Sequence, residues 1–349
     1  MANRVARLRT FWEEITSPTA GWPAQPARAY AEVQRKTGAA VALLCGQPGF
    51  FTPRPPIAWW STAQPISYYD TGALKSTLER LVDFDRINNI RDIRLSVGAA
   101  NVRTGRLEYF DSEKIAIRPE HVMASAALPP GFPCVEVDGE PYWDGGLISN
   151  TPLQYLLDYY PRRSRLCFQV DLFHAYGESP RNLDEVAERE KDIRYSSRTR
   201  MTTESFRERH EVRHAINELY KLLPDELKRS RQGQRLYEFG CVTTMDIVQL
   251  IYRPFEPQGA CKDYEFSRAT MNQRWQQGVT DAVTTLQASP WTAPASPEVG
   301  VRAFDVIHDI LVRVLGDDEH ARPVGHRAIE DLLRSHPWQQ ASATGRAAI

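Results

Sequence analysis

The sequence predicts an α/β protein followed by a mainly helical extension, and three observations carry this expectation. The chain has 349 residues, of which 42% are hydrophobic, enough for one large α/β domain with appended helices or for two domains. Apolar segments of helical and of strand period alternate in its first half. Beyond residue 180 the composition changes to strongly charged segments.

The N-terminal region combines helices with a stiff aromatic loop. Apolar residues recur at helical spacing from Val5 and predict a helix that ends near Ser17 and Pro18. Residues 46–60 are dense in proline and aromatic rings, and predict a long loop. Residues 71–82 place their leucines on one face and predict a second helix.

Two hairpins are expected next. Residues 93–102 and 106–110 read as a strand and a returning strand around the turn Thr104-Gly105. Residues 135–142 read as a smaller hairpin, because Asp138-Gly139 is a favoured two-residue turn. Asp144 follows directly from the second arm of this hairpin.

The remaining elements alternate at longer intervals. The predictions, in chain order, are a helix over 152–159, a buried strand over 166–172, two charged helices over 182–223, a strand over 245–252, a helix over 267–286, a linker over 288–297 and an amphipathic helix around 307–314. Residues 339–349 are expected to be disordered. The predicted division is an α/β part over 1–175, a charged helical extension with one strand over 176–290, and a linker, short helices and tail over 291–349.

Charge and cysteine content exclude several function classes. Forty-three basic residues are matched by 44 acidic ones, which argues against a nucleic-acid binder. The five cysteines are widely spaced and lack C-x-x-C patterns, so neither a disulfide framework nor a cysteine zinc site is indicated, and no cofactor is expected. No signal peptide or membrane-spanning segment is recognisable, so a cytoplasmic or peripheral membrane location is expected.

The run from Tyr142 to Pro152 is the most informative stretch. It contains Asp144-Gly145-Gly146 at the end of a predicted strand, an arrangement that suits an exposed catalytic base. An Asp-Gly pair is also an ordinary turn, so the motif alone leaves a purely structural reading open. Gly145 and Gly146 are expected to allow a close backbone approach and positive φ.

Together with residues 125–133 and Asn150-Thr151-Pro152, this run resembles the C-terminal half of a patatin-like phospholipase domain. The resemblance extends from Val5 to about Tyr252. It implies a three-layer α/β/α fold that here lacks its N-terminal strands, and hydrolysis of lipid acyl esters by a Ser-Asp dyad. The aspartate of the family's D-G-[AG] motif maps onto Asp144, which would be the proton acceptor.

The resemblance also implies a nucleophile that this sequence does not contain. No G-x-S-x-G elbow occurs, and Ser96, Ser125 and Ser149 all lack the flanking glycines that expose a nucleophilic serine. We therefore expect an N-terminally truncated member that is inactive and poorly stable by itself. A non-catalytic remnant that binds lipid or a partner is the alternative.

Two further patterns predict other activities. His210-Glu211-Val212-Arg213-His214 matches the H-E-x-x-H zinc motif of metalloproteases, but its charged neighbours favour a solvated helix. Phe50, Phe51, Ile57, Trp59 and Trp60 could contact a membrane interface or, alternatively, cap the protein core.

Overall fold

A computed structural model describes most of the chain. The described residues are 2–17, 28–60, 66–90, 93–149, 152–157, 162–177, 179–254, 258–295 and 299–315. They form two compact units, one of Met1–Pro152 with Gln258–Gln277 and the other of Leu153–Pro257 with Gly278–Ile349. Both units combine helices with a sheet, which confirms the predicted α/β class with a helical C-terminal part. The three-part division of the chain stays a prediction.

Unit 1 is built on an antiparallel sheet. Its strands are β3 (Ser96–Asn101), β4 (Leu107–Asp111), β5 (Val135–Val137) and β6 (Glu140–Asp144), in the order β4-β3-β6-β5. Both predicted hairpins are therefore confirmed. In the tighter one, Asp138 and Gly139 have φ values of 51° and 82°. These are the positive φ values that a type I′ turn requires at both central positions.

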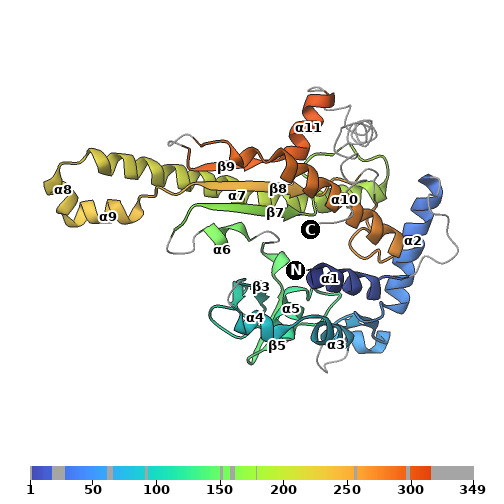
Figure 1. Ribbon diagram of the computed structural model, residues 1–349. Helices are drawn as coiled ribbons and strands as arrows, with labels where there is room; N and C mark the ends of the chain where they lie inside the picture. The colour runs from blue at the N-terminus through green and yellow to red at the C-terminus, as the bar shows by residue number, and fades with distance from the viewer. Residues whose placement is uncertain are drawn as a thin grey trace. The chain divides into compact units, whose positions relative to one another are not determined.

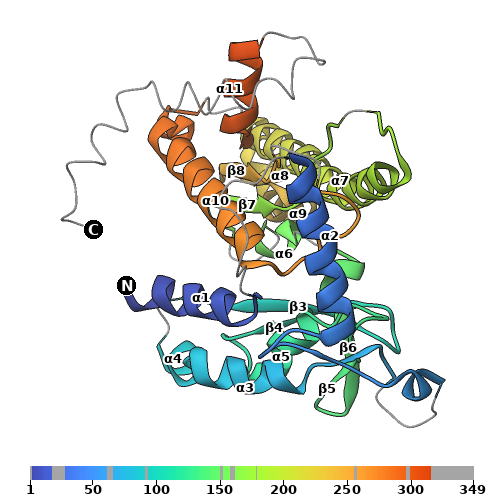
Figure 2. The ribbon, with the colours of Figure 1, turned by 90° about the vertical axis from the view of Figure 1, so that its right-hand side faces the viewer.

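Helix α5 (Pro119–Ser125) covers this sheet and encloses the core of unit 1 (Figure 2). It packs on β3, β5 and β6, and Ala99, Phe110, Ile117 and Tyr142 are buried in one apolar cluster. Around this core lie α1 (Ala2–Glu14), α2 (Arg28–Cys45), α3 (Gly72–Leu81) and α4 (Phe84–Asn89). The predicted helices at the N-terminus and over 71–82 are thus confirmed, whereas α2, α4 and α5 were not predicted.

The proline-rich loop of unit 1 folds back on itself. Strand β1 (Thr52–Pro53) pairs antiparallel with β2 (Tyr69–Asp70), and the 3₁₀ helix η1 (Pro56–Trp60) lies between them in the sequence. Residues 258–277 complete this unit, because Ser17 N–H donates to the Phe266 carbonyl at 2.8 Å and Arg268 N–H donates to the Ser17 carbonyl at 2.9 Å.

Unit 2 is built on a parallel sheet, which Figure 1 shows beside the long helix α7. Strands β7 (Arg165–Asp171), β8 (Met245–Ile251) and β9 (Val301–Phe304) lie in the order β7-β8-β9. The short helix α6 (Leu153–Leu157) precedes β7. Leu153, Phe206, Met245, Ile247 and Val301 form the core cluster of this unit.

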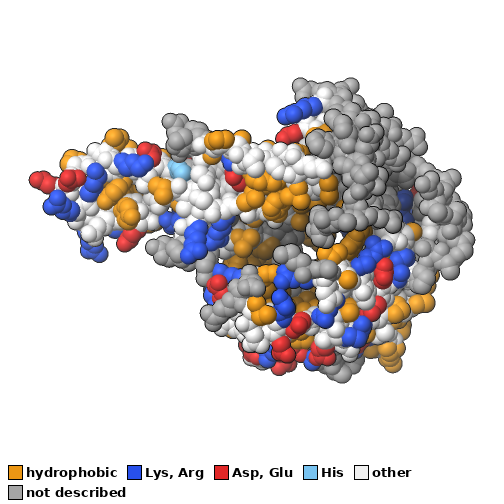
Figure 3. Space-filling model, viewed as in Figure 1, with side chains coloured by type: hydrophobic (Ala, Val, Ile, Leu, Met, Phe, Trp, Pro, Cys, Tyr) orange, Lys and Arg blue, Asp and Glu red, His pale blue; other side chains and the backbone are white. Residues whose placement is uncertain are grey.

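Helix α7 (Leu183–Leu222) corrects the prediction of two charged helices over 182–223. It is one helix of 40 residues, with Asn182 as its N-cap, whose side chain accepts from the Glu185 N–H at 2.9 Å. Neither glycine nor proline occurs within it, and pairs such as Arg194–Glu190 support it at i,i+4 spacing. It continues into α8 (Asp225–Arg229) and α9 (Arg231–Phe239), where acidic and basic side chains cover the tip (Figure 3).

Two further predictions about unit 2 need correction. Strand β7 is buried on one face only, since Leu166, Phe168 and Val170 are 44%, 43% and 60% exposed. The predicted linker over 288–297 contains the 3₁₀ helix η3 (Pro290–Thr292), whose Trp291 packs against Phe168 at 5.6 Å between ring centroids.

The predicted strand over 245–252 and the predicted helices over 267–286 and around 307–314 are confirmed as β8, α10 (Arg268–Ala288) and α11 (Val306–Leu315). Residues 339–349, predicted to be disordered, lie outside the described residues. Among the described helices, none has the length and apolar character needed to cross a bilayer.

Candidate functional site

Asp144 is the last residue of β6 and lies opposite Ala99 of β3. Its backbone N–H donates to the Ala127 carbonyl at 2.9 Å, which ties the strand end to the segment after α5. Its carboxylate Oδ1 accepts from the Gly146 N–H at 2.7 Å, so the carboxyl group caps the turn that follows. Backbone bonds on both sides therefore fix the direction of this side chain.

The carboxyl group of Asp144 is half-buried and forms no ion pair with any described residue. Burial raises the pKa of Asp144, and the Gly146 hydrogen bond opposes this rise. A carboxylate held by one N–H, with no cation beside it, is a better proton acceptor than a salt-bridged one. The electrostatics thus suit a general base.

Gly145 and Gly146 permit this turn for a steric reason. A Cβ atom on Gly145 would lie 2.5 Å from the Gly98 carbonyl oxygen, so the backbones of β3 and the turn approach too closely for any side chain. A Cβ atom on Gly146 would lie 3.0 Å from Asp144 Oδ1. The expected close approach is present, but the expected positive φ is wrong, since neither glycine has it.

Of the serines Ser96, Ser125 and Ser149, Ser96 has a hydroxyl group that is already engaged. The Ser96 hydroxyl donates to Asp111 Oδ2 at 2.9 Å, and Asp111, which is fully buried, also binds Arg94. Ser125 ends α5, and the Ser149 N–H donates to the Gly145 carbonyl at 2.9 Å.

The aromatic loop divides into core and surface parts. Phe51 is 3% exposed and its ring contacts Tyr69, Phe132 and Phe266. Phe50 shares the last two partners, at 5.4 and 5.7 Å. Membrane insertion of Phe51 is therefore wrong, because its ring fills the core of unit 1.

The surface part of this loop is η1. Ile57 is 85% exposed, and Trp59 lies 5.1 Å from the Tyr68 ring. A membrane contact of Ile57 and Trp59 stays a prediction. The side chain of Trp60 lies outside the description.

The histidines of the H-E-x-x-H motif are in a different environment from the one predicted. His210 is 3% exposed, and its ring lies 5.5 Å from that of the buried Phe206, so this face of α7 is not solvated. Burial lowers the pKa of His210 and favours the neutral ring. The Glu211 side chain is exposed and pairs with Arg207 at 3.0 Å, as expected for a residue 100° around the helix from His210. The Glu211 carboxylate is thus engaged by Arg207 on the exposed side of α7.

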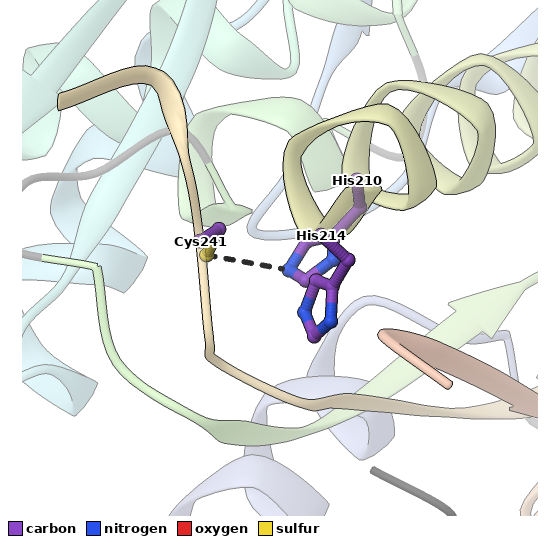
Figure 4. Close-up of side chains that lie close together, drawn as sticks. All are labelled: His210, His214 and Cys241. Atoms are coloured by element: carbon purple, nitrogen blue, oxygen red, sulfur yellow. Dashed lines mark hydrogen bonds between the residues drawn. The ribbon is translucent and has the colours of Figure 1, made fainter. Parts of the chain in front are cut away.

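The side chain that lies close to both histidines is that of Cys241 (Figure 4). One donor atom each from His210, His214 and Cys241 lie within 4.8 Å of one another. Sequence spacing does not point to this residue, because Cys241 follows His210 by 31 positions and outside any short metal-binding motif. Only the return of the chain from α9 toward β8 brings it to α7.

Comparison with protein families agrees with this fold. A family model described as patatin-like phospholipase matches residues 37–157, which include Asp144, Gly145 and Gly146. This part of the chain is similar to the patatin-like phospholipase family. A second, more particular model, described as patatin phospholipase, matches residues 193–298. The comparison with curated proteins found no match.

Proposed function

We propose that this chain supplies the proton acceptor, Asp144, of a Ser-Asp dyad that hydrolyses acyl esters of lipids. The observation that carries the proposal is the fixed, half-buried carboxyl group at the end of β6, within the segment that matches the patatin-like family. The family implies a lipid substrate. The membrane contact proposed for Ile57 and Trp59 would bring the chain to such a substrate at a surface.

The chemistry assigns one step to each group. Asp144 would accept the hydroxyl proton as a serine oxygen attacks the ester carbonyl, and would then return it to the leaving alcohol. Backbone N–H groups would have to stabilise the oxyanion that forms. Gly146 N–H is already bound to Asp144 Oδ1, so it orients the base and is not an oxyanion donor.

The 349 residues contain no recognisable serine nucleophile for this reaction. The sequence contains no G-x-S-x-G elbow, and the Ser96 hydroxyl is bound to the buried Asp111. We therefore propose that this polypeptide by itself does not hydrolyse esters. The same observation favours a second candidate, a non-catalytic lipid-binding protein of this family.

The first experiment measures hydrolysis of a short-chain p-nitrophenyl ester by the purified 349-residue chain. We expect no rate above the uncatalysed blank. Hydrolysis that is lost in Asp144→Asn would contradict the proposed inactivity while supporting the role of Asp144.

The second experiment tests the role of Asp144 with a nucleophile present. The coding sequence in frame before Met1 is read, and any elbow-containing segment is expressed together with this chain. Asp144→Asn is then expected to lower kcat/KM by about 10²- to 10⁴-fold, the usual contribution of a general base. Asp138→Asn is the matched control, since Asp138 lies in the β5–β6 turn and pairs with Arg118 at 2.7 Å. Equal activity of the Asp144 and Asp138 variants would contradict the dyad.

A further inference from the structure

Among the described residues, one group of side chains could hold a metal ion, and it lies in unit 2. His210 and His214 are one turn apart on α7, and Cys241 lies in the segment that joins α9 to β8. His210 and Cys241 are 3% and 6% exposed, and His214 is half-buried. Their donor atoms all lie within 4.8 Å of one another (Figure 4).

The polar atoms of the cluster are not all satisfied by hydrogen bonds. His210 Nδ1 is buried and has no hydrogen-bond partner among the described residues. Cys241 Sγ lies 3.9 Å from His210 Nε2 and 3.0 Å from the Thr243 hydroxyl. The nitrogen that faces the thiol is Nε2, and its other neighbour is the Thr243 hydroxyl at 3.4 Å, so no short hydrogen bond holds this side of the His210 ring.

The backbone carbonyl of Thr243 already orients the His214 ring. Its Nε2 lies 2.8 Å from the Thr243 carbonyl, so the ring donates that proton and leaves Nδ1 as the nitrogen with a free lone pair. Metal-binding histidines usually donate their other ring N–H to a carbonyl or carboxylate in this way. The ring is held at the position that a ligand would need.

The backbone of Gly300 and the ring of Phe206 enclose the cluster. A Cβ atom on Gly300 would lie 2.5 Å from His210 Nδ1 and 3.0 Å from His214 Nε2, so the chain before β9 packs closely on both rings. Phe206 is 2% exposed and covers His210 from one turn earlier on α7. Apolar shielding of this kind is what a buried metal site requires.

We propose that His210, His214 and Cys241 bind one zinc ion. Two imidazoles and a thiolate form a ligand set that suits Zn²⁺. Bond lengths of about 2.0–2.1 Å to nitrogen and about 2.3 Å to sulfur place tetrahedral donors within about 4 Å of one another. Small side-chain rotations would therefore close the cluster. The Cys241 thiol releases its proton to solvent as the Zn–S bond forms.

This zinc site has a structural role. Glu211 is paired with Arg207 on the exposed side of α7, so the site lacks the base of an H-E-x-x-H protease. The ion would instead join α7 to the segment that enters β8, the central strand of the sheet. It would thereby fix the α7–α9 helical hairpin to the body of unit 2.

The test uses the full chain, stripped with a chelator and titrated with ZnCl₂ against a chromophoric competitor. We expect one zinc ion per chain and a higher thermal midpoint with zinc than with chelator. Cobalt in place of zinc should give a thiolate-to-metal charge-transfer band. Cys241→Ser should abolish this band, and His210→Ala or His214→Ala should weaken zinc binding by at least 10-fold.

Matched controls separate the site from general effects. Cys167→Ser removes a half-buried thiol elsewhere in unit 2 and should leave zinc binding unchanged. Glu211→Gln should also leave it unchanged. Circular dichroism in chelator establishes that each variant is folded before its affinity is compared. Absence of stoichiometric zinc in the folded parent would overturn the proposal, as would zinc binding that survives Cys241→Ser or depends on Glu211.

Discussion

Burial of the Asp144 carboxyl group should make the protein less stable at neutral pH than it would be with a neutral side chain. Burial raises the pKa of Asp144 in the folded state. The folded state therefore binds this proton more tightly than the unfolded state. The stability contributed by this group is complete below the ordinary pKa of aspartate, about 3.9, and is lost as pH rises through the folded-state pKa.

The substitution Asp144→Asn tests whether the charged carboxylate lowers the stability of the folded state. An asparagine keeps an oxygen that can accept from the Gly146 N–H but carries no charge to bury. We expect the thermal midpoint of the variant to exceed that of the parent at about pH 7, and the difference to disappear near pH 3. A variant that is less stable than the parent at neutral pH would show that the charged form is the favoured one.

Gly145 is expected to be intolerant of the smallest side chain. Its φ is not positive, so the cost of Gly145→Ala comes from the approach of Cβ to the Gly98 carbonyl, with a further tight contact to Leu107 Cδ1 at 3.2 Å. Because backbone atoms cannot rotate away, we expect the free energy of unfolding in urea to fall by about 1–3 kcal/mol. In the control Gly278→Ala, the new Cβ in α10 meets no described atom within 4 Å, and a gain of up to about 1 kcal/mol is expected.

Single residues differ in how far the sequence predicts their place. The position of Asp144 at a strand end could be predicted, because the Asp138-Gly139 turn fixes the register of the strand before it. The partners of His210 could not, because Cys241 reaches it only through the return of the chain from α9. Local charge suggested a solvated helix, whereas long-range packing buries the His210 face.

At the scale of elements, α7 can be tested as one continuous helix. Met201 lies near its middle with a side chain that is 67% exposed, so its replacement removes little packing. Met201→Pro should lower the free energy of unfolding by roughly 3 kcal/mol or more, because proline removes a helical hydrogen bond and clashes with the preceding turn. Met201→Ala should change it little. Two separate helices with a break near residue 201 would tolerate the proline.

The elements that the sequence predicted share a local cause. The two hairpins carry their own turn residues, and α3 carries its own apolar face. Strand β9 lacked such a signal, because it has only four residues, too few to show a clear alternation of apolar and polar side chains. Pairing with β8 makes it a strand, and Arg302 binds Asp246 across that pair at 2.7 Å.

At the scale of the whole molecule, sequence continuity does not define the units. The patatin-like match ends at residue 157, yet unit 1 also needs residues 258–277. Phe266 from that segment lies 5.7 and 5.8 Å from the rings of Phe50 and Phe51. Arg268 Nε donates to the Thr16 hydroxyl at 2.7 Å. This segment thus closes the aromatic core of unit 1.

A fragment of residues 1–152 should therefore fold poorly. Without Phe266, the rings of Phe50 and Phe51 lose part of their cover, and exposed apolar rings are costly in water. We expect a broad thermal transition and binding of a hydrophobic dye, whereas the same fragment joined to residues 258–277 by a Gly/Ser linker should melt cooperatively. If the fragment without residues 258–277 melts cooperatively at the same temperature as the linked fragment, these residues contribute no stability to unit 1. If only the linked fragment melts cooperatively, the core of unit 1 depends on a segment that lies more than one hundred residues after Asp144 in the sequence. The hydrogen bond between Ser17 and Phe266 implies this dependence.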